Sequence, residues 1–316
     1  MYYLGVDGGG TKTRYILINE NFNKLVDIER GTIHIHQVGI DFFREELTST
    51  IESVCNEVKI SKKDLDYIFL AIPGYGESIE DKLIIDSIIA DILNGIPYST
   101  DNDCVAGWAA GTGCKDGINI VAGTGSIAFG KNKYGKTARS GGWGPTIGDD
   151  GGAHWIGLKV INEYTKQKDG RKDKTQLVEI MEREMGINYY YGIVDLVFNQ
   201  YKLRRTEIAG LSKVASIAAE SGCPVCIEIF KQAAEELFLH INSLAKELNF
   251  DDEFVVSYTG GVFKSGDLIL KPISEMIDRA NLRCKLTAPK LDPWNGAALM
   301  AYSLSGKDIP EDYYFS

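Results

Sequence analysis

Apolar residues recur along this chain with two periods, and their order predicts an α/β protein. Short apolar stretches separated by polar turns predict strands at 2–6, 14–18 and 24–29. Apolar residues at positions 43, 47, 51, 54 and 58 follow the helical period and predict a helix over 41–58. A strand at 67–72 and a helix at 79–93 follow, so strands and helices alternate in this part of the chain.

The plan at the start of the chain recurs about 115 residues later. The second copy has predicted strands at 118–122, at 126–129 and near 136–140. After residue 150 the pattern is largely helical, with the longest helical stretch at 227–248, and a strand at 253–258 then ends in Thr259-Gly260-Gly261. We expect two lobes joined by a hinge, comprising residues 1–107 plus 298–316 and residues 108–297.

A glycine turn separates the first two strands of each copy, and each turn carries hydroxyl side chains. Glycine lets the backbone approach a ligand closely and direct N–H groups at it. Two such turns in matching settings predict a two-sided phosphate clamp, formed by Gly9, Gly10, Thr11, Lys12 and Thr13 and by Gly123, Thr124, Gly125 and Ser126. Asp7, at the end of the first strand, is expected to hold a magnesium ion that neutralises the phosphates.

Residues 130–137, GKNKYGKT, match the G-x-x-x-x-G-K-[ST] pattern of a Walker phosphate loop. The Walker mechanism requires a buried strand before the loop and a helix directly after it. The downstream residues ARSGGWGPTIGDDGG are rich in glycine and contain a proline, so no helix begins there. We therefore interpret 131–135 as a hairpin turn and expect the phosphate site at the glycine turn before it.

The composition and charge of the chain argue against several classes of protein. The formal charge is −10 and the basic residues are scattered, which argues against a nucleic-acid surface. The sequence has no apolar run near 18 residues and no charged-then-apolar leader, so we expect neither a membrane span nor a secretory signal, and a cytoplasmic location. Six cysteines in this context indicate reduced thiols, and a redox or cluster role for the close pair Cys223 and Cys226 is disfavoured.

Three motifs in a fixed order carry a resemblance to a known superfamily. Asp7-Gly-Gly-Gly-Thr-Lys-Thr13, Ala122-Gly-Thr-Gly-Ser126 and Thr259-Gly-Gly-Val-Phe263 resemble the ATPase core shared by actin, sugar kinases and heat-shock chaperone ATPases. Within it, the chain is similar to the branch that holds N-acetylglucosamine kinases and the BadF-BadG-BcrA-BcrD ATPases, which include activases of reductases and dehydratases. The resemblance extends nearly end to end, to 289–298, and GGWG followed by GD at 141–150 is similar to the amino-sugar kinases.

The resemblance implies two ribonuclease-H-like lobes of the actin-like ATPase type around a nucleotide cleft. It implies that Asp7 and the two glycine turns hold Mg²⁺ and the phosphates of ATP, with Gly260 and Gly261 against adenosine. A sugar site combines carboxylates with an aromatic wall. Asp149 and Trp143 fit those needs, and the resemblance adds Gly142 and the second turn, with Gly125 and Ser126. Trp143 as a core residue and Asp149 as a turn residue are the alternatives.

Phosphoryl transfer also needs an acceptor for the proton of the attacking hydroxyl. Asp101 and Asp103 lie between a short predicted strand and a helix, and counting along the resemblance favours Asp103 as the base. Asp101 is then expected to cap the helix. At His34 the amino-sugar kinases carry an asparagine, so we expect an altered substrate preference or, as the alternative, a structural histidine.

The sequence therefore predicts an ATP- and Mg²⁺-dependent kinase that phosphorylates the 6-hydroxyl of N-acetylglucosamine, N-acetylmuramic acid or both, and that forms a homodimer by analogy with relatives. The alternative is an ATP-driven activase with an iron–sulfur cluster shared between subunits, for which Cys104, Cys114, Cys223 and Cys226 are candidate ligands. A sugar-sensing regulator is disfavoured, because the DNA-binding relatives carry an additional helix-turn-helix.

Overall fold

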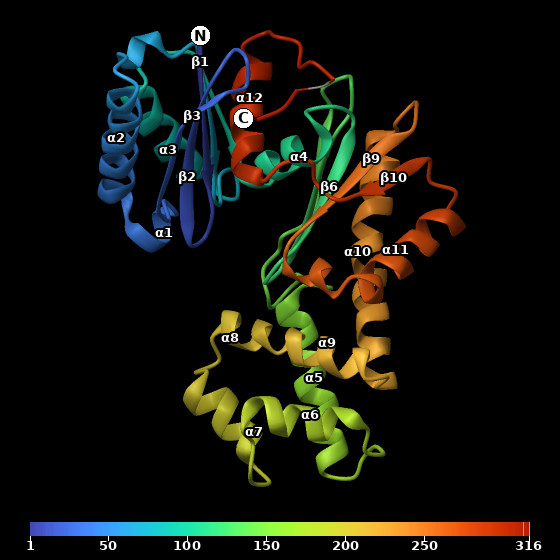
Figure 1. Cartoon of the computed structure of the whole chain (residues 1–316). Helices are drawn as coiled ribbons and strands as arrows, with labels where there is room; N and C mark the ends of the chain where they lie inside the picture. Colours follow the sequence, from blue (N-terminus) through green and yellow to red (C-terminus); the bar gives the residue numbers. More distant parts are fainter. Residues whose placement is uncertain (312, 316) are drawn as a thin grey trace. The chain divides into compact units, whose positions relative to one another are not determined.

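The computed structural model describes residues 1–311 and 313–315, and its chain divides into two compact units (Figure 1). Unit 1 comprises Met1–Asn119 and Ala288–Ser316, and unit 2 comprises Ile120–Thr287. These boundaries differ from the expected ones at 107/108 and 297/298. The difference arises because helix α4 (Cys104–Thr112) packs against α12 (Pro293–Leu304) inside unit 1.

Unit 1 is built on a sheet with the strand order β3-β2-β1-β4-β5. Its remaining elements are β1 (Tyr2–Gly8), β2 (Lys12–Asn19), β3 (Lys24–Gly31), α1 (Ile35–Val38), α2 (Ile40–Glu57), a 3₁₀ turn (Lys62–Asp64), β4 (Tyr67–Ile72), α3 (Ile79–Ile92) and β5 (Tyr98–Asn102). β1 and β2 pair in antiparallel fashion, whereas β1 and β4 pair in parallel, as a helical crossover through α2 requires. The strands and helices predicted in this part of the chain are confirmed.

The two faces of the β1 strand are covered by different helices. Leu4 and Val6 pack in a buried apolar cluster with the α2 residues Phe43 and Leu47. On the opposite face, a Cβ atom at Gly5 would collide with the α12 backbone at Ala298. The glycine therefore allows α12 to lie directly on the sheet, with α4 beside it (Figure 1).

Unit 2 contains the matching sheet, with the order β10-β9-β6-β7-β8. Its elements are β6 (Gly117–Ala122), β7 (Ser126–Lys131), β8 (Thr137–Gly141), α5 (Ala153–Lys168), α6 (Gln176–Met185), α7 (Gly192–Val194), a π-helical turn (Asp195–Gln200), α8 (Arg205–Gly210), α9 (Ser212–Glu220), α10 (Pro224–Leu248), β9 (Phe254–Thr259), a 3₁₀ turn (Gly261–Ser265), α11 (Asp267–Arg279) and β10 (Cys284–Thr287). Read from the other edge, β8-β7-β6-β9-β10 repeats the order of the first sheet. The repeat predicted from the two glycine turns is confirmed.

The apparent Walker motif lies in the hairpin between β7 and β8. Gly135 N donates to Asn132 O at 2.9 Å, and Asn132 N donates to Lys136 O at 3.0 Å, which closes the turn. Strand β8 follows directly where a Walker loop needs a helix. The interpretation of 131–135 as a hairpin turn is therefore confirmed. Among the residues that the structure describes, no helix is long and apolar enough to cross a membrane.

Candidate active site

The first glycine turn joins β1 to β2 in unit 1. Gly9 N donates to Lys12 O at 2.8 Å, and the Thr32 hydroxyl donates to Gly9 O at 2.7 Å, so the turn is tight and fixed from one side. Gly10 has open space where a side chain would stand, and Thr11 is exposed. The turn therefore presents free backbone to a ligand at Gly10 and Thr11.

The other two predicted ligands of this turn are placed differently. Lys12 is exposed and its Nζ pairs with Glu29 at 2.8 Å, while it also lies 5.5 Å from the ring centre of Trp294. Thr13 is fully buried, and its hydroxyl has no partner among the described residues. Thr13 is thus a residue of the interior, whereas Lys12 reaches a ligand only by leaving Glu29.

Asp7 ends β1 beside this turn, and its electrostatic environment is unusual. Desolvation, as the larger cause, and the Asp103 carboxylate together raise the pKa of its carboxyl from the ordinary 3.8 to about 7, while Lys12 acts in the opposite direction. A desolvated carboxylate with a second carboxylate near it gains most from a cation beside it. Carboxylate oxygens are the ligands that Mg²⁺ prefers, so Asp7 fits a magnesium-assisted phosphate site.

Asp103 stands at the N-cap position of α4 but makes no capping hydrogen bond with its side chain. The neighbouring Asn102 caps the helix instead, because its Oδ1 accepts from Cys104 N at 3.2 Å. The carboxylate of Asp101 accepts from Asn102 N at 2.8 Å within β5. The expectation that Asp101 caps the helix is therefore wrong, since an asparagine one residue nearer takes the position.

His34 caps the short helix α1, with Nδ1 accepting from His36 N at 3.3 Å. Because Nδ1 accepts, the proton of the neutral ring lies on Nε2, and that edge faces Gly74. An asparagine both donates and accepts, whereas His34 in this arrangement offers a ligand only a donor. His34 therefore has the structural role that was expected as the alternative, because its Nδ1 caps α1. Its Nε2 is the ring nitrogen left for a ligand.

The second glycine turn, Gly123 to Gly125, joins β6 to β7 in unit 2. The N-terminus of α5 is bonded to it, with Ala153 N donating to Gly123 O at 2.9 Å and His154 N to Thr124 O at 3.0 Å. These bonds fix the carbonyl groups of the turn on one side. Gly123 has open space on its side-chain face, so the turn keeps a free surface.

The loop 141–150 is tied to this turn through Ser126. The Ser126 hydroxyl donates to Asp150 O at 2.6 Å, and the backbone carbonyl of Ser126 accepts from Gly142 N at 2.9 Å. Ser126 is buried, so it holds both ends of the loop from within. From α10, the His240 ring bonds the Ser140 hydroxyl at 2.8 Å and fills the space in which a Gly141 side chain would stand.

Trp143 and Asp149 lie on this loop in contrasting environments. Trp143 is 71% exposed, so the alternative that it is a core residue is wrong. Asp149 is buried and adopts φ +61°, a left-handed conformation that costs a non-glycine residue free energy. Its carboxylate forms an ion pair with Arg205, the first residue of α8. Sequence reasoning missed Arg205 because no motif marks a partner 56 residues away.

The third glycine turn contacts the second. Gly260 adopts φ +109°, and a Cβ atom there would collide with Ala122 O at the end of β6. Only glycine allows this approach. A cavity of about 250 Å³ opens beside Gly261, lined by the apolar residues Ile156, Ile217, Phe230 and Val262 and by the polar residues Ser212, Lys213, Ser216, Glu220, Lys264 and Ser265. Apolar walls together with hydroxyl and charged groups that can form hydrogen bonds suit a planar heterocycle such as adenine.

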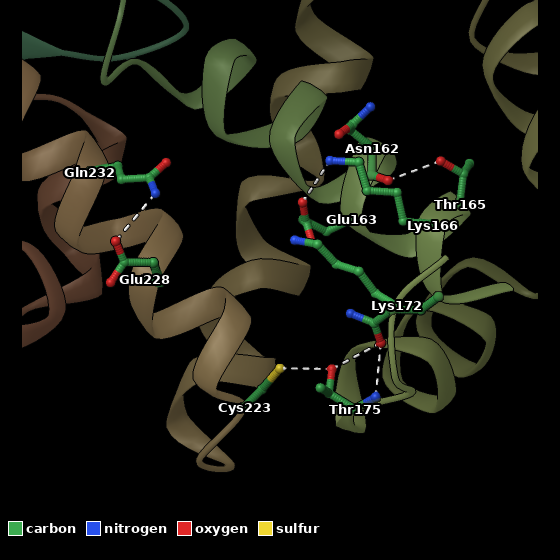
Figure 2. Close-up of polar contacts among 10 residues, drawn as sticks. Asn162, Glu163, Thr165, Lys166, Lys172, Thr175, Cys223, Glu228 and Gln232 are labelled. Carbon is green, nitrogen blue, oxygen red and sulfur yellow. Dashed lines mark hydrogen bonds and ion pairs between the residues drawn. The ribbon is translucent and has the colours of Figure 1, made fainter. Parts of the chain in front are cut away.

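Two of the cysteines proposed as cluster ligands, Cys104 and Cys114, belong to unit 1, and the other two, Cys223 and Cys226, belong to unit 2. Cys104, Cys223 and Cys226 are buried, and Cys114 contacts Met300. Cys223 begins α10 and lies 3.3 Å from the Thr175 hydroxyl (Figure 2). Desolvation raises the pKa of its thiol, but hydrogen bonds from Thr175 and Cys226 outweigh it and leave the pKa lowered. A larger cavity, about 420 Å³, lies between α5 and α10 and contains none of the predicted site residues.

Comparisons with known proteins agree with this geometry. A family model described as "BadF/BadG/BcrA/BcrD ATPase family" matches residues 4–301. The chain is 30% identical over 310 residues to N-acetyl-D-glucosamine kinase of Dictyostelium discoideum, covering 95% of this chain and 97% of that protein. It is also 30% identical over 310 residues to N-acetylmuramic acid/N-acetylglucosamine kinase of Clostridium acetobutylicum, covering 96% and 98%.

Solved structures show the same fold. A protein proposed to be an N-acetylglucosamine kinase, from Chromobacterium violaceum, superposes with a TM-score of 0.72 at 22% identity, covering 95% of this chain and 98% of that chain. A ROK family glucokinase from Streptomyces griseus, in complex with glucose and AMPPNP, gives a TM-score of 0.51 at 19% identity, covering 96% and 99%. The expected α/β fold of two actin-like ATPase lobes is confirmed.

Proposed function

Because the chain belongs to the BadF/BadG/BcrA/BcrD ATPase family, we propose that it is an ATP-dependent kinase that phosphorylates an N-acetylated amino sugar. Two relatives that are similar over nearly the whole chain are named for this activity on N-acetylglucosamine, and one of them also on N-acetylmuramic acid. The structural observation that carries the proposal is the electrostatic coupling of Asp103 to Asp7, which puts a second carboxylate beside the first glycine turn. The activase alternative has less support, because the relatives similar over nearly the whole chain are named as sugar kinases.

The proposed nucleotide ligands come from both units. In unit 1 they are Asp7 and the turn from Gly9 to Lys12, and in unit 2 they are the turn from Gly123 to Gly125 together with Gly260 and Gly261. Thr13, which was predicted as a ligand from the sequence, is buried and is left out of the proposal. The cavity beside Gly261 takes the adenine in this proposal. Bound Mg²⁺ would neutralise the phosphate oxygens, and Asp7 is the carboxylate that would hold it, directly or through water.

The proposed sugar ligands are His34 and Asp103 in unit 1, and Gly125, Ser126, Gly142, Trp143 and Asp149 in unit 2. Asp103 accepts the proton of the 6-hydroxyl as that oxygen attacks the γ-phosphoryl group, which passes from ATP to the sugar and leaves ADP. Asp149 accepts from sugar hydroxyls, and the exposed Trp143 ring supplies an apolar wall for the C–H face. The homodimer and a cytoplasmic location remain predictions.

The test is ADP release with MgATP and each of N-acetylglucosamine, N-acetylmuramic acid, glucosamine, glucose and no sugar. We expect stimulation by the N-acetylated sugars alone. Asp103→Asn should lower kcat by about 10²- to 10⁴-fold with little change in the KM for either substrate, because a general base acts only on the chemical step. Asp101→Asn is the matched control, since Asp101 is exposed, two residues away and expected to leave kcat within a factor of about two.

Two results would contradict the proposal. Equal slow ATP hydrolysis with every addition would remove the sugar from the reaction. Near-normal turnover by an Asp103→Asn protein that binds both substrates would show that another group accepts the proton.

A further inference from the structure

The ion pair of Arg205 with Asp149 lies directly on the second glycine turn. A Cβ atom at Gly125 would collide with both the Arg205 Nη2 and the Asp149 Oδ2. The absence of a side chain at Gly125 therefore makes room for this pair. A guanidinium group is thus placed where a sugar held by Asp149 meets the turn proposed to bind phosphate.

The backbone of the segment before Arg205 adopts conformations of high free energy, and the helix that Arg205 begins is held in place by packing. A π-helical turn at Asp195–Gln200 precedes it, and Lys202 and Leu203 both adopt left-handed backbone conformations, at φ +50° and +56°. Such conformations in non-glycine residues cost about 1–3 kcal/mol each and cluster at functional sites. Helix α8 is then held against α5, where Gly157 makes room for the carbonyl group of Ile208.

Arg205 has more binding capacity than Asp149 uses. A guanidinium carries five N–H donors in a planar fork. Only Nη2 bonds Asp149, the buried Nε has no partner in the part of the chain that the structure describes, and the side chain is 40% exposed. If residue 205 served only to orient Asp149, a side chain with a hydroxyl or an amide would suffice and would leave no buried donor without a partner. The exposed, incompletely bonded cation indicates a ligand of opposite charge.

The charges around the guanidinium support an anionic ligand. Asp149 is the carboxylate paired with it, and the nearby His154 has its pKa lowered, mainly by desolvation and then by Arg205, so the histidine is neutral at pH 7. Without Arg205, a carboxylate on the substrate would meet the Asp149 charge uncompensated, in a protein whose net charge is −10. With Arg205, the local field permits both a hydroxyl acceptor and an acidic substituent.

We propose that Arg205 is a specificity-determining residue that binds a carboxylate carried by the amino sugar, so that the enzyme takes acidic as well as neutral N-acetylated sugars. This inference rests on the proposed kinase function. Asp149 binds the sugar hydroxyls, and the donors of Arg205 that Asp149 does not use bind the acidic substituent. Arg205 also orients Asp149, so its removal affects every sugar, but the acidic one most.

The test compares three sugars with MgATP: N-acetylglucosamine, N-acetylmuramic acid, and the carboxamide of N-acetylmuramic acid, which has nearly the same shape without the charge. In Arg205→Gln, kcat/KM should fall about 10- to 100-fold more for the acid than for the amide or for N-acetylglucosamine, the range expected for a lost charge-assisted hydrogen bond. Arg205→Lys should retain part of the preference for the acid. Arg204→Gln is the control, because Arg204 is exposed and pairs with Glu207 at 3.1 Å.

Each outcome decides between the hypotheses. An equal loss for all three sugars would overturn the inference and leave Arg205 only as a residue that positions Asp149. A wild-type protein that phosphorylates the neutral sugars and rejects the acid would overturn it while the kinase function stands. A wild-type protein inactive on every sugar would refute the proposed function itself. Retained activity on N-acetylglucosamine in Arg205→Gln shows that the variant folds.

Discussion

Replacing Asp7 by asparagine is expected to stabilise the ligand-free protein, although it should abolish kinase activity. The pKa of Asp7 is about 7 in the folded chain against an ordinary value of 3.8, with desolvation as the main cause and the Asp103 carboxylate as the second. Between these two values the folded state binds a proton that the unfolded state has lost. Stability therefore falls as the pH rises through this window, and the loss is complete above pH 8.

The magnitude follows from the same two pKa values. Each pKa unit corresponds to about 1.36 kcal/mol, so the ionised Asp7 destabilises the folded protein by up to about 4 kcal/mol above pH 8. Asparagine has no charge to desolvate, and we expect it to recover about 2–4 kcal/mol, because an amide does not match every hydrogen bond of a protonated carboxyl. Near pH 4.5 the wild-type carboxyl is protonated, and the two proteins should differ little.

Urea unfolding without Mg²⁺ or nucleotide measures this difference. Replacing Trp143 and Trp155 by phenylalanine in both proteins leaves Trp108 and Trp294, so that fluorescence reports on unit 1 alone. Asp101→Asn is the control and should change stability by less than about 0.5 kcal/mol. If the Asp7 variant were no more stable than wild type at pH 8, Asp7 would not be a desolvated charge, and the magnesium argument would lose its basis.

Three further predictions follow from contacts described above. His240→Gln should raise the KM for the sugar several-fold, because His240 bonds Ser140 at the start of the loop 141–150. Desolvation lowers the pKa of this histidine in the folded protein, so the wild type should lose stability as the pH falls below about 6.5. The variant should lose less stability over the same range, which urea unfolding at several pH values would measure. Gly296→Ala should destabilise unit 1 by about 1–3 kcal/mol in thermal unfolding, because its Cβ would collide with Ala106 O where α12 crosses α4. Lys136→Ala should leave the KM for ATP within about twofold of wild type, since this lysine lies in a hairpin turn, and a tenfold increase in that KM would revive the Walker interpretation.

Much of the fold could be predicted from the sequence because the signals are local. The strand at 67–72 and the helix that begins at Ile79 were predicted at their observed positions, since apolar period and flanking polar residues determine them. The doubled glycine turn predicted that each sheet begins with a hairpin of neighbouring strands, whereas the places of β4 and β9 in the two sheets depend on contacts that the hairpins do not determine. The boundary between the units was displaced, because the packing of α4 on α12 joins residues nearly 200 positions apart.

The site could be predicted only in part, for the same reason. The glycine turns have short-range signatures, so Gly10, Gly123 and Gly260 could be singled out from the sequence. Their supporting residues, Arg205 and His240, are single side chains brought in from helices far along the chain, and no spacing marks them. The helix cap was assigned to Asp101 from capping propensity, which is high for aspartate and for asparagine alike. In the structure the side chain of Asn102, and not that of Asp101, accepts the hydrogen bond from Cys104 N.

The position of α12 has a consequence for how the protein is made. The face of β1 that carries Gly5 is covered by α12, which follows β1 in the chain by nearly 300 residues and is therefore synthesised much later. Residues 120–287 separate the two parts of unit 1, and at 5–20 residues per second a ribosome needs roughly 10–30 s to pass them. Throughout that interval the part of the first sheet that α12 covers stays uncovered, and it is still uncovered when the sequence of unit 2 is complete. Unit 1, which begins first, can complete its fold only after the second unit has been synthesised, and chaperone binding to the nascent chain should be concentrated on the uncovered face of its sheet.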